Sequence, residues 1–401
     1  MPDDQKYAVW CGIDVGKEAH HACALDENGD RLFDRPLPQD EASLKELFER
    51  LRTHGRVLVI VDQPNTIGSL SIAVAKASGV DVAYLPGLAM RKAAQLLPGD
   101  AKTDARDAYV IAITAQRIPD TLREVGRDDE TMAELRVYAG RDDDLVGDAT
   151  RSVNRLRAAL LQIHPALERV FRGSKITNDL TLDLLIHYGG PSGLMRAGRV
   201  RVTAWAKKSG HRKVEPSICE VFDALAQQTV TVAGTAAAEA VIPQIAQSIK
   251  DTKHQRAQLN AQVEQLIADH PLYGVLVSMP GVGTKTAIAV LLAVGDASSF
   301  PSAGHLASYA GIAPTTWQSG KSIKGEHPSR AGNKQLKNAL FRSAWVATLH
   351  DPASRAYYQR KRSEGKRHNA AVICLARRRC DVIWAMLRKR SLYQAELPSA
   401  A

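Results

Sequence analysis

A short apolar run and two further short segments at the start of the chain form a pattern that predicts β-strands. The segments are 7–13, 20–25 and 31–35. The turn between the last two contains Asn28-Gly29, which is a strong hairpin signal. A continuous apolar run at 57–61 predicts a central strand that is buried on both faces. The chain is therefore expected to begin with an antiparallel meander, followed by a buried strand.

Apolar residues at helical spacing fill the segments that follow these strands. The predicted helices are 41–52, 67–78, 87–97 and 104–116, and one more strand is predicted at 80–84. The order β-β-β-α-β-α-β-α is that of a ribonuclease H-like α/β fold. We expect this fold to cover residues 1–125.

Two long amphipathic helices are predicted next, at about 130–170 and about 241–269. Their pattern predicts an antiparallel hairpin or a coiled-coil arm. The mixed stretch between them predicts short helices. The expected domain boundaries after the first domain are 126–270 for a helical coiled-coil region, 271–395 for a mainly α C-terminal domain, and 396–401 for a tail.

Charge is unevenly distributed in this basic chain. Lys and Arg outnumber Asp and Glu by 53 to 43, which gives a net charge of +10. Residues 351–390 carry almost all of that excess, with Arg377, Arg378 and Arg379 in succession. Concentrated positive charge favours a polyanionic partner, because each phosphate contact releases counterions. We therefore expect these arginines to bind nucleic acid.

The five cysteines and the hydropathy exclude several classes of protein. An odd number of cysteines without CxxC spacing argues against a disulfide framework and against a zinc site. The sequence contains no cleavable apolar leader and no apolar stretch long enough to span a membrane. We expect a soluble cytoplasmic protein in a reducing compartment, without a membrane partner.

Four carboxylates occupy positions that the predicted fold brings together. Asp14 follows the first strand and Asp62 follows the buried strand, so both emerge at one sheet edge. Asp104 and Asp107 share one face at the start of a helix. Four convergent carboxylates repel each other unless a cation such as Mg²⁺ or Mn²⁺ binds, and two such ions can assist phosphoryl transfer. The alternatives are turn or cap roles, with Asp104 as an N-cap and Asp100 as a competing ligand.

A glycine-rich turn at 279–286 precedes another predicted helix. Its spacing does not fit a phosphate-binding P-loop. It is closer to a helix-hairpin-helix turn, in which backbone amides at a helix N-terminus bind a DNA phosphate. We expect Gly281, Gly283 and Lys285 to contact nucleic acid in this way, and a simple helix-entry turn is the alternative.

Ser319 lies in the segment Gln318-Ser-Gly-Lys321, where a glutamine precedes it and a glycine and a lysine follow it. Such a serine is accessible in a predicted loop and could attack a phosphodiester if a metal or base activated it. An ordinary polar loop serine is the alternative, and Ser322 and Ser329 are equal candidates on composition. Lys321 is expected to contact nucleic acid.

Together these motifs resemble the DEDD transposases of the IS110 group of bacterial insertion sequences. The residues that carry the resemblance are 12–17, 62–64, 101–108, 279–283 and 311–333, so it spans nearly the whole chain. It implies a RuvC-like N-terminal domain, a coiled-coil middle and a C-terminal transposase domain. It also implies recombination of the element through a circular intermediate, guided by a structured bridge RNA from the element's own end that pairs with donor and target DNA.

The resemblance also implies roles for individual residues. Asp14, Asp62, Asp104 and Asp107 would hold Mg²⁺, while Ser319 attacks DNA and becomes linked to the 5′ phosphate. The family's second acid is glutamate, whereas this chain has Asp62, which is one methylene shorter and draws the metal closer to its strand.

The resemblance implies a bacterial, nucleoid-associated transposase or site-specific recombinase. Because exchange of two duplexes needs at least two serines, we expect a dimer or tetramer. The alternatives are an Mg²⁺-dependent Holliday-junction resolvase that uses activated water and a non-catalytic protein that binds element ends.

Overall fold

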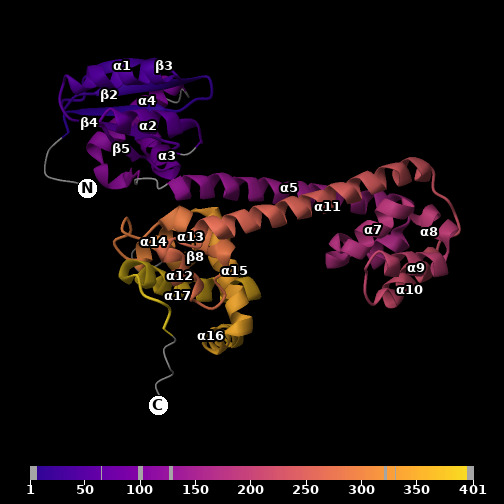
Figure 1. Ribbon diagram of the computed structural model, residues 1–401. Helices are drawn as coiled ribbons and strands as arrows, with labels where there is room; N and C mark the ends of the chain where they lie inside the picture. Colours follow the sequence, from indigo (N-terminus) through magenta and orange to yellow (C-terminus); the bar gives the residue numbers. More distant parts are fainter. Residues whose placement is uncertain are drawn as a thin grey trace, which may run out of the picture. The chain divides into compact units, whose positions relative to one another are not determined.

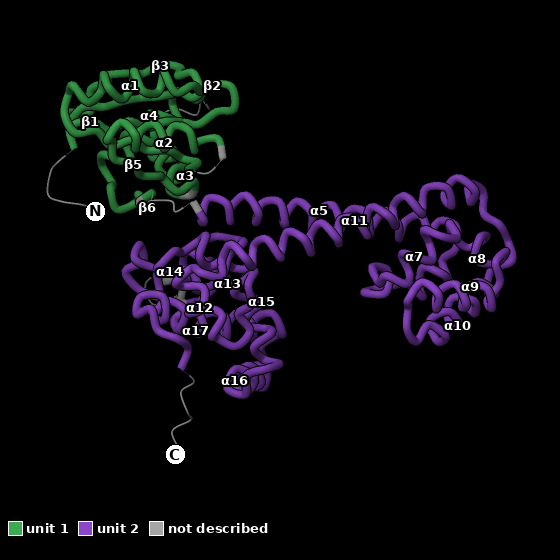
Figure 2. The backbone as a smooth tube through the Cα atoms, viewed as in Figure 1, with its two compact units in different colours: residues 1–129 green, residues 130–401 purple. Residues whose placement is uncertain are grey.

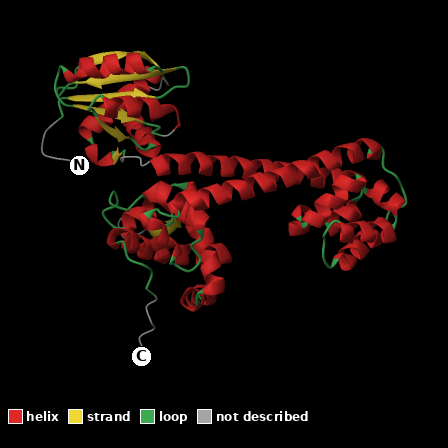
Figure 3. Ribbon diagram, viewed as in Figure 1, coloured by secondary structure: helices red, strands yellow, loops and turns green. Residues whose placement is uncertain are grey.

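The computed structural model describes residues 7–64, 66–97, 103–125, 130–319, 323–329 and 331–394. The chain divides into two compact units, residues 1–129 and residues 130–401 (Figure 2). The first is a mixed α/β unit and the second is mostly helical (Figure 3). No helix in the described part of the chain is long and apolar enough to cross a membrane.

The first unit contains a six-stranded sheet, within the described residues, in the order β3-β2-β1-β4-β5-β6. The strands are β1 (Val9–Asp14), β2 (Ala19–Leu25), β3 (Arg31–Pro38), β4 (Val57–Val61), β5 (Asp81–Tyr84) and β6 (Arg123–Glu124). The first three strands form an antiparallel meander, as predicted. Strand β1 pairs in parallel with β4, and β4 pairs in parallel with β5. The short antiparallel β6 was not predicted from the sequence.

Helices cover both faces of this sheet. They are α1 (Glu41–Arg52), η1 (Thr66–Gly68), α2 (Ser69–Ala77), α3 (Gly87–Leu96), α4 (Asp104–Arg117) and η2 (Pro119–Thr121). On one face Val59 packs in a core with Phe48 of α1. On the other face Ile60 packs with Ile111 of α4. Strand β4 is therefore buried on both sides, which confirms what its continuous apolar run predicted.

Two long helices of the second unit, α5 (Glu130–Ile163) and α11 (Thr235–Ile267), lie side by side (Figure 1). They run antiparallel, since Leu135 near the start of α5 shares a core with Ile267 at the end of α11. The first helix ends at Ile163, earlier than predicted. His164 precedes Pro165, and the ring of a proline disfavours helical geometry in the residue before it. His164 instead caps the next helix by accepting from the Leu167 N–H at 3.1 Å.

Between the long helices the chain forms a small all-helical core, which we call the inserted bundle (165–225). Its elements are α6 (Pro165–Val170), η3 (Gly173–Thr177), α7 (Asp179–Tyr188), α8 (Pro191–Ala197), α9 (Arg199–Lys208) and α10 (Val214–Leu225). This core includes Leu160 of α5 and Ile242 of α11, so the bundle is built onto one end of the hairpin. The prediction of short helices in this stretch is confirmed.

The remaining residues build a second helical core around α5 and α11. Its elements are α12 (Pro271–Val277), α13 (Thr284–Val294), α14 (Ala303–Tyr309), β7 (Pro314–Ser319), β8 (Ile323–Pro328), α15 (Lys334–His350), α16 (Pro352–Ser363) and α17 (His368–Lys389). The segment that contains Ser319 was predicted as a loop. The structure corrects this, because β7 and β8 pair antiparallel and Ser319 is the last residue of β7, opposite Ile323.

Candidate metal centre

Asp14 and Asp62 emerge at the same edge of the sheet. Asp14 ends β1, and Asp62 directly follows β4, whose Val61 lies opposite Ile13 in the parallel register. The Val15 N–H also donates to Asp62 Oδ1 at 3.4 Å. Two adjacent strand ends therefore fix the backbone of both acids, and the structure brings this predicted pair together.

A close approach between β1 and α4 brings the other two carboxylates to this edge. A Cβ on Gly12 would lie 2.4 Å from Ala108 O and 2.5 Å from Ala112 N, so only glycine lets α4 pack directly on the strand. Asp104 and Asp107 occupy the turn of α4 just before Ala108. Gly12 thereby sets how near the helix acids come to the strand acids.

The charges of the other three carboxylates act on Asp14. The pKa of Asp14 is raised to about 6, first by burial and then by the negative charges of its three carboxylate neighbours. These neighbours are Asp62, Asp107 and Asp104. Burial also raises the pKa of Asp62, although the Val15 N–H opposes that shift. The cluster is electrostatically unfavourable by itself and would be relieved by a cation.

Thr103, rather than Asp104, caps α4. The Thr103 hydroxyl accepts from the Arg106 N–H at 3.2 Å, and the Thr103 carbonyl accepts from the Asp107 N–H at 2.9 Å. The alternative that Asp104 acts as the N-cap is therefore wrong. Both acids of the first turn keep their carboxylates for other partners, in a position that the helix dipole favours for negative charge.

The donor set suits a hard divalent cation, because carboxylate oxygens are the ligands that Mg²⁺ and Mn²⁺ prefer. In the described part of the chain, however, no three His, Cys, Asp or Glu side chains are arranged so that they could hold a metal ion. The other three carboxylates are near enough to raise the pKa of Asp14, but the four side chains are not arranged to coordinate one ion. Binding a cation thus requires these side chains to draw together.

Two histidines that the sequence analysis did not single out border the carboxylates. His21 lies opposite Asp14 in the β1–β2 register, and its charge lowers the pKa of Asp14. Its Nε2 is 2.9 Å from Asp34 Oδ1. Buried His20 accepts from the Gly16 N–H at 3.2 Å and so holds the turn that follows Asp14. Only the register of the meander reveals these roles.

The predicted nucleophile lies in the second unit. The structure gives Ser319 as the end of β7 but does not describe its side chain. Lys321, Ser322 and the competing acid Asp100 lie outside the described residues. Ser329, an alternative nucleophile, donates its hydroxyl to Ala331 O at 3.3 Å.

The predicted phosphate-binding turn joins α12 to α13. Gly281 has a φ of +80°, and a Cβ there would lie 2.6 Å from Ser343 O, so this glycine lets the turn pack against α15. Gly283 is the N-cap residue of α13 and provides no side-chain cap. Lys285 is 2.8 Å from Asp142 of α5, so a phosphate would have to compete with that carboxylate.

Arg379 corrects the prediction that the three successive arginines bind nucleic acid. Its side chain is only 4% exposed, and burial lowers its pKa to about 10. The guanidinium donates to Pro280 O at 2.6 Å and to Ser343 Oγ at 2.9 Å. It therefore fastens the glycine turn to α15 from inside the protein and is unavailable to a nucleic acid.

The other two arginines of the run are accessible to different degrees. Arg378 is exposed, and its guanidinium lies 5.5 Å from the centre of the Tyr357 ring. Arg377 is half-buried and forms an ion pair with Asp381 one turn later. Of the three, Arg378 is the best placed to bind a phosphate.

Comparisons with known proteins match both units. A family model for the DEDD transposases of IS110, described as a transposase, matches residues 11–165. A second, described as the transposase IS116/IS110/IS902 family, matches residues 273–359. A 43.6 kDa protein of insertion element IS110 from Streptomyces coelicolor is 48% identical over 400 residues, covering 100% of this chain and 98% of the relative. The chain belongs to the IS110 family of transposases.

Two further relatives of this IS110-family transposase differ in how much they share with it. A 42 kDa protein of insertion element IS900 from Mycobacterium paratuberculosis is 35% identical and covers 98% of this chain and 99% of its own length. The pilin gene-inverting protein of Moraxella bovis is 38% identical over 138 residues, which are 33% of this chain and 43% of that protein. As a transposase, the protein is a DNA strand-transfer enzyme, and DEDD transposases typically depend on a metal ion.

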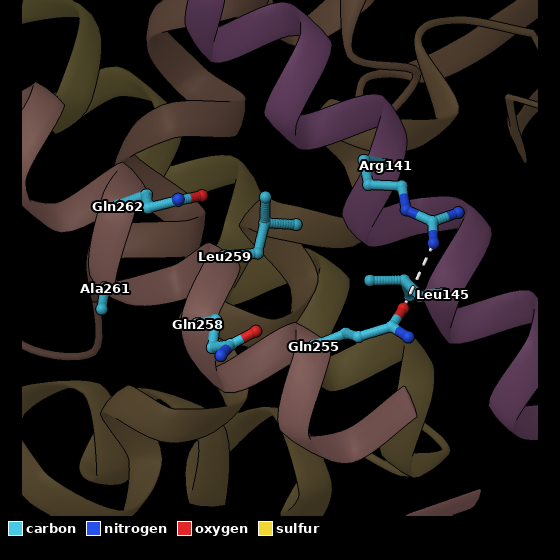
Figure 4. Close-up of a pocket in the computed structure, with 7 residues that line it drawn as sticks. All are labelled: Arg141, Leu145, Gln255, Gln258, Leu259, Ala261 and Gln262. Atoms are coloured by element: carbon cyan, nitrogen blue, oxygen red, sulfur yellow. Dashed lines mark hydrogen bonds between the residues drawn. The ribbon is translucent and has the colours of Figure 1, made fainter. Parts of the chain in front are cut away.

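A hollow of about 520 Å³ lies between the long helices of this transposase (Figure 4). It is lined by Arg141, Leu145, Gln255, Gln258, Leu259, Ala261 and Gln262. Arg141 donates to Gln255 across it at 3.2 Å. Because the lining provides amides but neither a carboxylate nor a hydroxyl nucleophile, this hollow suits a contact surface better than a reaction site.

Replacing Asp14 of the transposase with asparagine is expected to stabilise the metal-free protein. An acid whose pKa is higher in the folded than in the unfolded state destabilises the fold at high pH. That penalty is fully present above the folded value of about 6, shrinks as the pH falls toward 3.8, and is absent below it. With allowance for solvent screening of a half-buried group, we expect a gain of about 1–2 kcal/mol at pH 8 and about half of that at pH 5.

Urea denaturation of both proteins in EDTA at the two pH values measures this gain. A gain of equal size at pH 8 and pH 5, or no gain, would contradict the electrostatic reading of the cluster. Added Mg²⁺ should raise the stability of the wild-type protein more than that of the variant, since only the wild type keeps all four carboxylates.

Proposed function

We propose that this transposase recombines its own insertion element as a site-specific enzyme, with a metal-holding carboxylate cluster and Ser319 acting on the same DNA phosphate. The observation that carries the proposal is that Asp14 lies near the acid that follows β4 and the two acids of α4, whose negative charges add to burial in raising its pKa, in a chain of this family. Asp14, Asp62, Asp104 and Asp107 would hold Mg²⁺ or Mn²⁺. The bound ion would stabilise the charge on the attacking and leaving oxygens.

In the proposed chemistry the bonds to phosphorus are exchanged one for one. The Ser319 Oγ gives up its proton and attacks the phosphorus, the bond to the 3′ oxygen breaks, and that oxygen gains a proton and leaves as a 3′ hydroxyl. The serine is then linked to the 5′ phosphate. A 3′ hydroxyl from another strand reverses these steps and releases the serine. No bond energy is lost, so rejoining needs no ATP.

The rigid parts of the fold support the roles of the four acids. Asp14 and Asp62 continue from paired strands, so their backbones cannot separate without breaking the sheet. Asp104 and Asp107 belong to a capped helix, α4, which packs directly on β1 at Gly12. Because these elements fix the backbones of the four acids, a bound metal would need to order only their side chains.

A plasmid that carries the element tests the proposal. Incubated with the protein and Mg²⁺, it should yield joined circles, together with a protein–DNA adduct on a denaturing gel, and EDTA should stop both. Hydrolysed ends without an adduct would instead favour a resolvase-like nuclease that uses activated water. If the wild-type protein bound the plasmid but formed no product, and Asp14→Asn changed nothing, the protein would be a non-catalytic binder of element ends.

We also propose that a bridge RNA encoded by the element guides the reaction. The net charge of +10 and the exposed cations of α16 and α17 support a polyanionic partner, and Arg378 is one of these cations. The helix-hairpin-helix-like turn at Gly281 and Gly283 is proposed to hold a DNA phosphate. Sequencing of nucleic acid that co-purifies with the protein should return one discrete RNA from the flanks of its gene, and random cellular RNA would reject the proposal.

A dimer or tetramer is proposed because exchange of two duplexes requires at least two serines. The hollow between α5 and α11 supports this as a surface for a second copy (Figure 4). The pilin gene-inverting relative has a name that describes inversion of a DNA segment, which is likewise an exchange between two sites. Light scattering of the purified protein gives the mass, and a monomer in the presence of DNA would exclude the proposal.

A further inference from the structure

The inserted bundle (165–225) has a strongly basic segment that the proposed function does not use. Residues 191–214 contain seven Lys or Arg and no Asp or Glu. The seven are Arg196, Arg199, Arg201, Lys207, Lys208, Arg212 and Lys213, and all are exposed. The segment lies outside both ranges that the family models match, which end at residue 165 and resume at residue 273. Its charge therefore calls for an explanation apart from the two matched domains.

Most carboxylates in and around the bundle are already neutralised by other cations. Asp179 is 2.6 Å from Lys253, and Glu220 is 2.6 Å from Lys175. The remaining pairs of this kind are Glu168 with Arg157 and Arg172, and Asp183 with Lys250 and His211. Of the seven basic residues, within the described chain, only Lys207 pairs with a carboxylate, that of Glu215 at 2.5 Å. The other six form a surface of uncompensated positive charge.

Helix α9 presents part of this charge along one outward face. Val202 and Ala206 are buried and fix which side of α9 faces the core. Arg201 and Lys208 lie on the opposite side, seven residues and about 10 Å apart. Exposed Ala204 lies between them and leaves room for a backbone to approach. The face thus combines two cations with a small residue, as a surface for phosphates requires.

The start of α9 points to the same kind of partner. Gly198 provides no side-chain cap, and the first turn contains Arg199 and Arg201 but no acid. Cations near a helix N-terminus are disfavoured by the helix dipole, so this arrangement is destabilising until an anion approaches. A polyanion would offset both the dipole and the mutual repulsion of the cations.

The aromatic residues of the bundle distinguish between kinds of nucleic acid. Trp205 stacks on His187 with ring centres 4.5 Å apart, and the Tyr188 ring meets it edge-on at 5.4 Å. No Phe, Tyr or Trp of the inserted bundle is exposed. Proteins hold single-stranded nucleic acid largely by stacking its bases on exposed aromatic rings, and this surface has no exposed Phe, Tyr or Trp. The exposed cations therefore suit contacts to the phosphate backbone of a duplex.

We propose that α8, α9 and the loop that leads to α10 bind the phosphate backbone of double-stranded DNA without reading its sequence. The bundle would give the transposase a second hold on DNA, apart from the sites at which strands are cut and rejoined. The inference goes beyond the proposed function, and it is tested by binding in EDTA. Its failure therefore leaves the catalytic proposal untouched.

Binding of the full-length protein to a 30-base-pair duplex of arbitrary sequence tests this surface. Fluorescence anisotropy over a range of salt concentrations gives the slope of log K against log [salt], which changes by about 0.9 for each lost phosphate contact. The triple variant Arg201→Gln, Lys208→Gln, Arg212→Gln should lower that slope by about 2–3. At 0.1 M salt its affinity should fall about 10- to 100-fold. An unchanged slope and affinity would overturn the proposal.

Matched controls separate the surface from general charge. The variant Arg172→Gln, Lys175→Gln, Lys253→Gln removes the same formal charge from cations that are already paired, and its slope should stay that of the wild type. The charge-keeping variant Arg201→Lys, Arg212→Lys should retain binding, which excludes misfolding as the cause. If the triple variant lost binding to a structured RNA but not to the duplex, or lost only its oligomeric mass, the duplex-DNA proposal would be rejected.

Discussion

Asparagine in place of Asp14 is expected to lower the rate of strand transfer by about 1,000-fold or more while DNA binding persists. The substitution removes a negative ligand but keeps the shape of the side chain at the end of β1. Metal stabilisation of the charge on transferring oxygens is worth several kcal/mol, and each 1.4 kcal/mol corresponds to a factor of ten in rate. The same change should stabilise the metal-free fold, so the loss of activity cannot be ascribed to unfolding.

The measurement is the initial rate of joined-product formation at saturating Mg²⁺. Asp120→Asn is the matched control, because Asp120 is an exposed acid of the same unit, in η2. It should retain the wild-type rate. Equal rates for Asp14→Asn and the wild type would remove Asp14 from the metal site.

Alanine in place of Ser319 is expected to abolish the covalent protein–DNA adduct completely. Alanine lacks the oxygen that forms the bond to phosphorus. The pairing of residue 319 with Ile323 of β8 involves only the backbone, so the substitution leaves the hairpin unchanged. DNA binding and oligomeric mass should therefore stay unchanged. The readout is radiolabelled DNA that stays with the protein on a denaturing gel.

Ser329→Ala is the control for this variant. Ser329 is an alternative nucleophile of the region, and the structure describes its side chain, whose hydroxyl donates to Ala331 O. It should still form the adduct. If the adduct persisted in Ser319→Ala, or was lost in Ser329→Ala, the assignment of Ser319 as the nucleophile would be wrong.

Elements with a strong local pattern could be predicted well from the sequence. Helix 41–52 and strand 57–61 have the predicted bounds, because the first has a clear apolar stripe and an Asp40 cap and the second is continuously apolar. The β7–β8 hairpin was missed, since its strands are mostly polar and each has one large apolar residue, Trp317 in β7 and Ile323 in β8. Its pairing is visible only once the two strands lie side by side.

The burial of Arg379 shows where the interpretation of a charge run fails. Three successive residues of a helix point in directions about 100° apart, so Arg377, Arg378 and Arg379 cannot all face solvent when one side of the helix is packed. Arg379 falls in line with buried Leu375 and Ile383, four residues away on either side. The helical period therefore predicts that Arg379 is buried, whereas the composition of the segment does not.

The carboxylate site was predictable in part. The positions of Asp14 and Asp62 follow from which strands are neighbours, and the sequence order of a ribonuclease H-like fold predicts that. The distance from these acids to α4 depends on the close packing at Gly12, and the cap depends on a choice between Thr103 and Asp104. Both residue types are good caps, so local preference does not decide between them.

The antiparallel hairpin of α5 and α11 has an evolutionary consequence. Helix α5 contacts the C-terminal core from Leu135 to Asp143, and α11 packs against that core again at Val263 and Ile267, so the part of the chain between Asp143 and Val263 is a closed excursion. Evolution can lengthen, shorten or replace that excursion by paired steps in both helices without moving its fixed end. The inserted bundle can thus change in size or surface without a change in the two domains that the family models match.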